Sequence, residues 1–126
     1  MAGAQILIVE DNEKSMKLFR DVLTATGYRT LEATTGSQAF ELAVEHGPDL
    51  VLMDVQLPDV DGVEALRRIR ADERTAPLSV LAVTAQAMHG DCERFLAAGF
   101  DGYLPKPVDV LQLLETVRRH CDDPAL

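Results

Sequence analysis

The chain lacks the features of a disulfide-rich or membrane-inserted protein. Its two cysteines, Cys92 and Cys121, are too few for a disulfide framework, and no Cys-x-x-Cys spacing suggests a zinc site. No apolar run approaches the ~18 residues that a membrane span needs. The first residues carry no basic region and soon meet the acids Glu10 and Asp11, which argues against a secretory signal. We therefore expect a cytoplasmic protein with reduced thiols and no membrane contact.

Basic residues are also scarce. The 12 Lys and Arg residues are outnumbered by 21 Asp and Glu residues, and the formal net charge is -9. Direct, non-specific binding to nucleic acid or to an anionic membrane needs clustered Lys and Arg, so neither is expected. The acidic balance suits cation binding or contact with a basic partner surface. It also suits plain solubility, and charge alone does not separate these interpretations.

What the chain does have is an ordinary globular composition, with 47% hydrophobic residues among 126. This is enough for one domain with its own core, and we treat residues 1–126 as that domain. Apolar strand-like runs alternate with amphipathic helix-like runs. The predicted strands span residues 5–10, 28–33, 49–54, 78–85 and 101–105. The predicted helices span residues 12–27, 36–47, 62–72, 88–99 and 108–121.

Helical spacing predicts which residues of four of these helices face the core. In chain order they are Leu18, Phe19, Val22 and Leu23; Ala39, Phe40, Ala43 and Val44; Val63, Leu66 and Ile69; and Val110, Leu111, Leu114 and Val117. The strict alternation of strands and helices predicts an α/β fold with parallel strands, right-handed crossovers and helices on both faces.

The polarity of the strands predicts their order in the sheet. The first, third and fourth are almost wholly apolar and should be central, whereas the second and fifth are shorter or more polar and should be edges. This ranking fits a doubly wound, flavodoxin-like (βα)5 sheet with strand order 2-1-3-4-5, in a three-layer α/β/α arrangement.

Polar side chains follow four of the predicted strands, at the edge of the sheet where such folds bind ligands. They are Glu10–Asp11, Asp54, Thr84–Ala85 and Lys106–Pro107. Acids and turn residues favour strand ends in general, but that explanation weakens when four strands deliver them to one edge. Three close carboxylates repel unless a proton or a cation lies among them, and Mg²⁺ prefers such oxygen ligands. An ammonium suits a phosphoryl oxygen. The set therefore predicts a phosphoryl-transfer site with a carboxylate acceptor.

Four motifs carry a resemblance to a known family. "LIVEDN", "LVLMDVQLPDVDG", "AVTA" and "YLPKP" occur in the order and spacing of the CheY-like response-regulator receiver domains of two-component signalling. Each motif alone is weak, but the set is specific and covers the chain from Ile6 to about His120. The segments around these motifs are most similar to stand-alone regulators of cell division. Glu10 stands where Asp is frequent in the family, and its longer side chain suits an outer-shell role.

The resemblance implies a phosphoacceptor and a metal site. Asp54 would accept the phosphoryl group, as its place at the end of a central strand also suggests. Asp11, Asp54 and the backbone carbonyl of Gln56 would bind Mg²⁺, with Mn²⁺ as a substitute, and Glu10 would act through a metal-bound water. Gln56 and Gln86 would tune the rate of dephosphorylation.

The resemblance also implies a switch. Lys106 would pair with the phosphoryl group or with Asp54, and the Lys106–Pro107 peptide bond would be cis. The Thr84 hydroxyl and the Ala85 amide would bind phosphoryl oxygens. Tyr103 would turn inward as Thr84 moves, altering the surface of the fourth helix, fifth strand and fifth helix.

The expected partners are a histidine kinase or a histidine phosphotransfer protein, and a downstream protein bound at that altered surface. We expect a monomer or a weak phosphorylation-dependent dimer. The chain would not be an enzyme beyond self-catalysed phosphoryl transfer and dephosphorylation. Met16 is either a soft contact for a docked kinase or a residue at the core edge, and the sequence favours neither.

Other polar residues have simpler interpretations. Asp49 precedes its strand and lies far from the predicted site. Asp59 and Asp61 are expected to be solvated turn residues, and Asp61 also suits a helix cap. His89 and Cys92 are three residues apart, but without a third ligand they do not predict a metal site.

Alternative functions fit less well. A flavodoxin would place a phosphate loop where Glu10–Asp11 would repel it, and a haloacid dehalogenase-type phosphatase needs Asp-x-Asp after the first strand. A Toprim-like nucleic-acid enzyme needs Asp-x-Asp after the third strand, where this chain has Asp54–Gln56. The chain could also be a receiver cut from a hybrid kinase or a DNA-binding regulator, although Met1 and the short tail after Cys121 suggest a complete protein.

Overall fold

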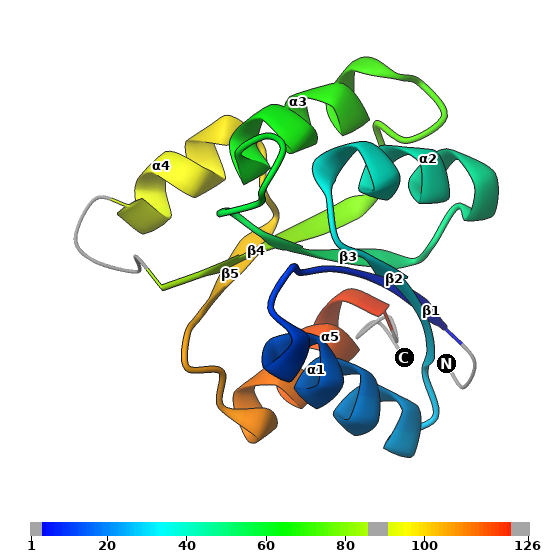
Figure 1. The fold of residues 1–126 in the computed structure, drawn as a ribbon, viewed down its shortest axis with the longest axis vertical. Helices are drawn as coiled ribbons and strands as arrows, with labels where there is room; N and C mark the ends of the chain where they lie inside the picture. Colours follow the sequence, from blue (N-terminus) through cyan, green and yellow to red (C-terminus); the bar gives the residue numbers. More distant parts are fainter. Residues whose placement is uncertain (1–3, 86–90, 122–126) are drawn as a thin grey trace.

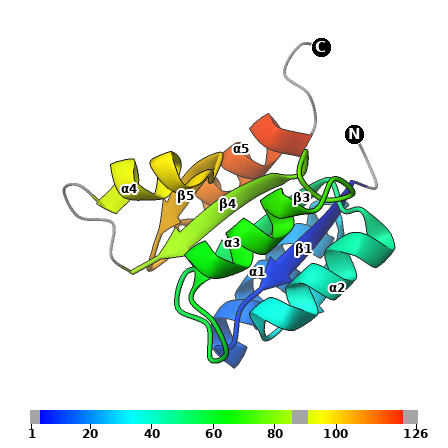
Figure 2. The ribbon, with the colours of Figure 1, turned by 90° about the horizontal axis from the view of Figure 1, so that it is seen from above.

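Five parallel strands form one sheet in the order β2-β1-β3-β4-β5, as the strand polarity predicts. The computed structural model describes residues 4–85 and 91–121, so the predictions for Gln86 and His89 lie outside the described residues. The strands are β1 (Gln5–Val9), β2 (Arg29–Ala33), β3 (Leu50–Asp54), β4 (Ser79–Thr84) and β5 (Gly102–Pro105). All neighbouring pairs are parallel, and Figure 2 shows β1 and β4 pointing the same way.

The helices cover both faces of the sheet, which gives the predicted three layers. They are α1 (Glu13–Ala25), α2 (Gly36–His46), α3 (Gly62–Ala71), α4 (Asp91–Ala98) and α5 (Val110–Cys121). α1 and α5 lie on one face, and α2, α3 and α4 lie on the other (Figure 1). Across residues 4–85 and 91–121, no helix combines the length and apolar character needed to cross a membrane.

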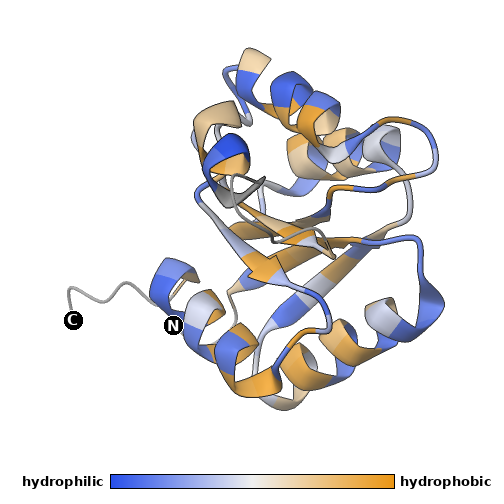
Figure 3. Ribbon diagram, turned by 90° about the vertical axis from the view of Figure 1, so that its left-hand side faces the viewer, coloured by the Kyte–Doolittle hydropathy of each residue, from blue (hydrophilic) through white to orange (hydrophobic). Residues whose placement is uncertain are grey.

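The central strands are buried on both faces, which explains their continuous apolar sequence. In β1, Leu7 and Val9 face the core under α2, α3 and α4, whereas Ile6 and Ile8 face the core under α1 and α5. Figure 3 shows the hydrophobic strands enclosed between the helical layers. One hydrophobic core packs against each face of the sheet, and together they fix the positions of the strand ends.

The predicted inward face was wrong at three positions. Leu18 of α1 is 37% exposed, and Val110 and Leu111 of α5 are 39% and 78% exposed. Met16 and Leu113 are buried in their place. Both helices carry apolar residues at two overlapping helical spacings, so the sequence pattern did not fix how each helix is rotated.

Parallel register brings the carboxyl ends of four strands to one edge. Val9 is paired with Met53, Asp54 with Val83, and Thr84 with Pro105. The residue after each strand therefore emerges at the same edge of the sheet. This register places Glu10 beside Asp54 without any long loop.

Candidate functional site

Three carboxylates meet at the edge where β1 and β3 end. Glu10 and Asp11 follow β1, Asp54 is the last residue of β3, and one oxygen from each lies within 4.8 Å of the others. Glu10 and Asp54 are buried, whereas Asp11 is exposed. The cluster is therefore closed on its inner side and open to solvent at Asp11.

Lys106 lies against the two buried carboxylates. Its Nζ is 2.9 Å from Glu10 Oε1 and 3.1 Å from Asp54 Oδ2. The Lys106 amide donates to the Thr84 carbonyl at 2.8 Å, which ties the end of β5 to the end of β4. The Lys106–Pro107 peptide bond is cis, as the family resemblance implies. One ammonium thus contacts two of the three carboxylates, and its single positive charge can offset only one of them.

Burial and neighbouring charges shift the protonation of this group. Burial raises the pKa of the Glu10 carboxyl from 4.5 to about 7, and the adjacent Asp54 adds to the rise while Lys106 opposes it. Burial disfavours the charge on Lys106, but hydrogen bonds and charges from Glu10 and Asp54 outweigh it and raise the pKa of the ammonium. Three carboxylates and one ammonium leave a net negative charge at the site when Glu10 is ionised, as expected where a cation binds.

The donor set fits a magnesium ion. All its side-chain ligands are hard carboxylate oxygens, which Mg²⁺ prefers. Among the described residues the buried Glu10 Oε1 makes no hydrogen bond of good geometry, although the Lys106 ammonium lies 2.9 Å away. A buried acceptor with spare hydrogen-bonding capacity favours a water or a cation-bound water as a further partner.

The loop between β3 and α3 shapes the other side of the site. The Gln56 amide donates to Asp54 Oδ1 at 2.9 Å, and Gln56 pairs with Asp61 in an antiparallel bridge. The Gly62 amide donates to the Val55 carbonyl at 2.9 Å, and a Cβ at Gly62 would lie 2.6 Å from Val55 Cα. Only glycine allows this close return of the chain, which holds the Gln56 main chain beside Asp54.

The proposed switch residues lie on neighbouring strands. Thr84 is fully buried at the end of β4, and Ala85 follows it at the surface. Tyr103 of β5 pairs with Ala82 in the sheet and is 38% exposed. Met16 is only 6% exposed and packs with the core under α1 and α5, as in the core-edge alternative.

The chain is similar to known proteins over almost its whole length. Residues 6–118 match the response regulator receiver domain family, which is most of the chain. The chain belongs to this family. Receiver domains act in two-component phosphorelay signalling, so the acidic pocket with its lysine lies in a signalling module.

Receivers similar to this chain include both regulators and parts of kinases. The polar-differentiation response regulator DivK of Brucella ovis is 47% identical over 118 residues, covering 94% of this chain and 96% of that protein. The receiver domain of the sensor histidine kinase PA1611 from Pseudomonas aeruginosa, solved with magnesium in its active-site cleft, is 38% identical with a TM-score of 0.88. The match covers 97% of this chain and all of that one.

A third similar structure is a complex. It is the co-crystal of the Saccharomyces cerevisiae histidine phosphotransfer protein Ypd1 with the receiver domain of its downstream response regulator Ssk1. It has a TM-score of 0.90 and 30% identity, and the match covers 99% of this chain and 93% of that one. In that complex a receiver domain of similar fold is bound to a histidine phosphotransfer protein.

The three other aspartates between residues 49 and 62 accept hydrogen bonds. Asp61 accepts from the amides of Val63 and Glu64 at 2.7 and 3.2 Å, which confirms its role as the cap of α3. Asp49 accepts from the Gln5 amide at 2.8 Å at the opposite edge of the sheet. Asp59 is exposed in the loop, as expected of a solvated turn residue, and it also accepts three hydrogen bonds from the start of α2.

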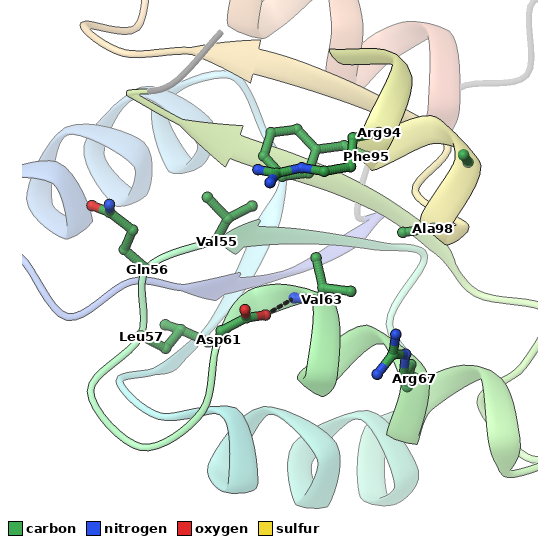
Figure 4. Close-up of a pocket in the computed structure, with 10 residues that line it drawn as sticks. Val55, Gln56, Leu57, Asp61, Val63, Arg67, Arg94, Phe95 and Ala98 are labelled. Atoms are coloured by element: carbon green, nitrogen blue, oxygen red, sulfur yellow. Dashed lines mark hydrogen bonds between the residues drawn. The ribbon is translucent and has the colours of Figure 1, made fainter. Parts of the chain in front are cut away.

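Sequence reasoning also missed a pocket beside the site, between the β3–α3 loop, α3 and α4. Its volume is about 880 Å³, and Figure 4 shows Val63 and Arg67 of α3 on one wall and Arg94 and Phe95 of α4 on the other. The Arg94 guanidinium lies 5.0 Å from the centre of the Phe95 ring. No motif marks this pocket, because the residues that line it come from separate segments.

Proposed function

We propose that Asp54 accepts a phosphoryl group from a histidine kinase or a histidine phosphotransfer protein. The observation that carries this proposal is the burial of Asp54 at the end of a central strand, 3.1 Å from the Lys106 ammonium and beside Glu10 and Asp11. We further propose that residues 1–126 act as one receiver domain, in the cytoplasm, where the Cys121 thiol would stay reduced.

In this proposal a divalent cation is held by Asp11, Asp54 and the Gln56 backbone carbonyl, with Glu10 acting through water. The magnesium in the cleft of the PA1611 receiver supports Mg²⁺ as the ion, and Mn²⁺ has the same preference for oxygen ligands. When bound, the ion would neutralise charge on the transferring phosphoryl oxygens.

The protein's own residues would carry the rest of the transfer. The bond between phosphorus and the donor histidine nitrogen breaks as a bond between phosphorus and an Asp54 oxygen forms. Lys106 would move its charge from the free carboxylate to a phosphoryl oxygen, which keeps the ammonium paired throughout. The Thr84 hydroxyl and the Ala85 amide would donate to a second oxygen.

The signal would leave the site through the α4–β5–α5 surface. Movement of Thr84 toward the phosphoryl group would open space for Tyr103, whose 38% exposure suits an outward position before phosphorylation. A downstream protein would bind the altered surface, with the chain as a monomer or a weak phosphorylation-dependent dimer. Gln56 and Gln86 would set the dephosphorylation rate, so the chain would turn over only its own phosphoryl group.

The relatives support the proposed partners. Ypd1 bound to the Ssk1 receiver supports a histidine phosphotransfer protein as donor, and the DivK regulators support a role in cell differentiation and division. A receiver within a longer sensor kinase is a second candidate, because the PA1611 domain is 38% identical to this chain. The reading frame beyond Leu126 distinguishes these two cases.

Acetyl phosphate with Mg²⁺ tests the proposal. We expect the intact mass of the protein to increase by one phosphoryl group, and Asp54→Asn to abolish the increase. Asp61→Asn is the matched control from the same loop, because asparagine also caps helices and should leave phosphorylation intact. Phosphorylation of Asp54→Asn at the wild-type level would refute the assignment.

A further inference from the structure

Asp59, at the tip of the β3–α3 loop, is bound to the first turn of α2. Its Oδ1 accepts from the Gly36 amide at 2.8 Å. Its Oδ2 accepts from the Ser37 amide and from the Ser37 hydroxyl, both at 3.1 Å. The Asp59 side chain thus joins the loop to residues that lie 22 and 23 positions earlier in the sequence.

The contact is close as well as polar. A Cβ at Gly36 would lie 2.5 Å from Val60 Cγ2, so the backbone of α2 touches the side chain next to Asp59. Ser37 Oγ also accepts from an Arg68 guanidinium nitrogen at 3.4 Å, which brings α3 into the same network. The tip of the loop is therefore attached to α2 directly and is linked to α3 through Ser37.

Charge strengthens this attachment. The amide groups at the start of α2 carry partial positive charge, which stabilises a carboxylate placed against them. Hydrogen bonds, first from the Gly36 amide and then from Ser37, lower the pKa of Asp59 from 3.8 to about 2. Asp59 is consequently ionised, and its bonds to α2 are charge-assisted, throughout the neutral range.

The base of the same loop forms one wall of the phosphorylation site. The Gln56 amide holds Asp54 Oδ1 at 2.9 Å, and the Gln56–Asp61 bridge closes the base. Six residues lie between Val55 and Gly62, and the described hydrogen bonds fix this segment at its base and at Asp59. Releasing the tip would let the chain on either side of Gln56 tilt away from Asp54.

We propose that Asp59 is a positioning residue for the receiver site: by fastening the loop to α2, it holds the Gln56 main chain in place for the cation and for Asp54. The effect on the cation rests on the proposed function, whereas the effect on the loop does not. Loss of an outer partner of a metal site commonly weakens metal binding by about 10- to 100-fold. Because Asp59 acts through the loop, we expect the lower end of this range.

Three variants separate positioning from general stability. Asp59→Ala removes the attachment, and Asp59→Asn keeps one acceptor oxygen and should restore part of it. Thr35→Ala is the matched control, because the Thr35 hydroxyl accepts from the Gln38 amide at 3.1 Å and caps the same helix, with no hydrogen bond to the loop among the described residues. Urea midpoints show how far each variant is destabilised.

The first readout needs no metal. Amide hydrogen exchange in the metal-free protein should accelerate at Gln56 as well as at Gly36 and Ser37 in Asp59→Ala. In Thr35→Ala the acceleration should reach Gln38 but leave Gln56 unchanged. Unchanged exchange at Gln56 in Asp59→Ala would overturn the inference, and so would equal acceleration at Gln56 in both variants.

The second readout is Mg²⁺ affinity by calorimetric titration. We expect about tenfold weaker binding in Asp59→Ala, an intermediate value in Asp59→Asn and wild-type binding in Thr35→Ala. Equal weakening by Asp59→Ala and Thr35→Ala would reduce the effect to helix stability and contradict positioning. If the wild type takes up no phosphoryl group, the proposed function fails, while the exchange data still decide the role of Asp59.

Discussion

At the residue scale, the receiver site depends on how one ammonium is shared. Lys106 contacts Glu10 and Asp54, both of which are nearly inaccessible to solvent. Removing one member of a buried ion pair leaves the other charges without compensation, which destabilises a fold more than loss of a surface pair. The lysine should therefore matter for stability in the metal-free protein, and less so when a cation can replace its charge.

Lys106→Met tests this arrangement. In Mg²⁺-free buffer at neutral pH we expect the free energy of unfolding to fall by about 2 kcal/mol, less than for a fully buried pair because the Lys106 side chain is 22% exposed. Urea denaturation with and without Mg²⁺ measures the loss, and added Mg²⁺ should recover part of it. Lys17→Met is the control, since Lys17 is 68% exposed and pairs with Asp21 on the surface. Equal losses in the two variants would contradict the account.

The lowered pKa of Asp59 predicts that its contribution to the stability of the fold depends on pH. Its pKa in the folded protein is about 2, below its ordinary value of 3.8, so its contribution to stability is complete above the ordinary value. The contribution is lost as the pH falls toward the folded value. The difference in unfolding free energy between wild type and Asp59→Asn should thus be constant near neutrality and shrink between about pH 4 and pH 2. Urea midpoints across this range measure it, and a constant difference down to pH 2 would disprove the charge-assisted contact.

At the element scale, strands were easier to predict than helix faces. The unbroken apolar sequence of β1, β3 and β4 indicated central strands because both of their faces must be covered. A helix needs only one apolar face, and α5 carries Val110, Leu111, Leu113, Leu114 and Val117, which are more than one face requires. Packing against the sheet determines which face of α5 is buried, and the spacing of its apolar residues does not predict that face.

Two neighbouring leucines of α5 test the observed face. Leu113→Ala should lower the free energy of unfolding by about 2–5 kcal/mol, because Leu113 is fully buried against the sheet. Leu111→Ala should change it by less than about 0.5 kcal/mol, because Leu111 is 78% exposed. Chemical denaturation of the two variants gives the comparison directly. A larger loss for Leu111→Ala would show that α5 is rotated as the spacing first suggested.

At the scale of the whole molecule, the topology explains why much of the site was predictable. In a parallel sheet the carboxyl ends of all strands share one edge, so Glu10, Asp11, Asp54 and Lys106 had to meet once the strands were identified. The attachment of Asp59 to α2 was not predictable, because it joins a loop to a helix across the molecule. The same applies to the pocket between α3 and α4.

The central claim is that Asp54 carries the phosphoryl group, and locating that group tests it most directly. After treatment with acetyl phosphate and Mg²⁺, borohydride reduction converts a phosphorylated aspartate to homoserine, and tandem mass spectrometry finds its position. We predict homoserine at position 54 alone, and none when Mg²⁺ is removed by a chelator. Homoserine at position 11, or at any position other than 54, would contradict the account.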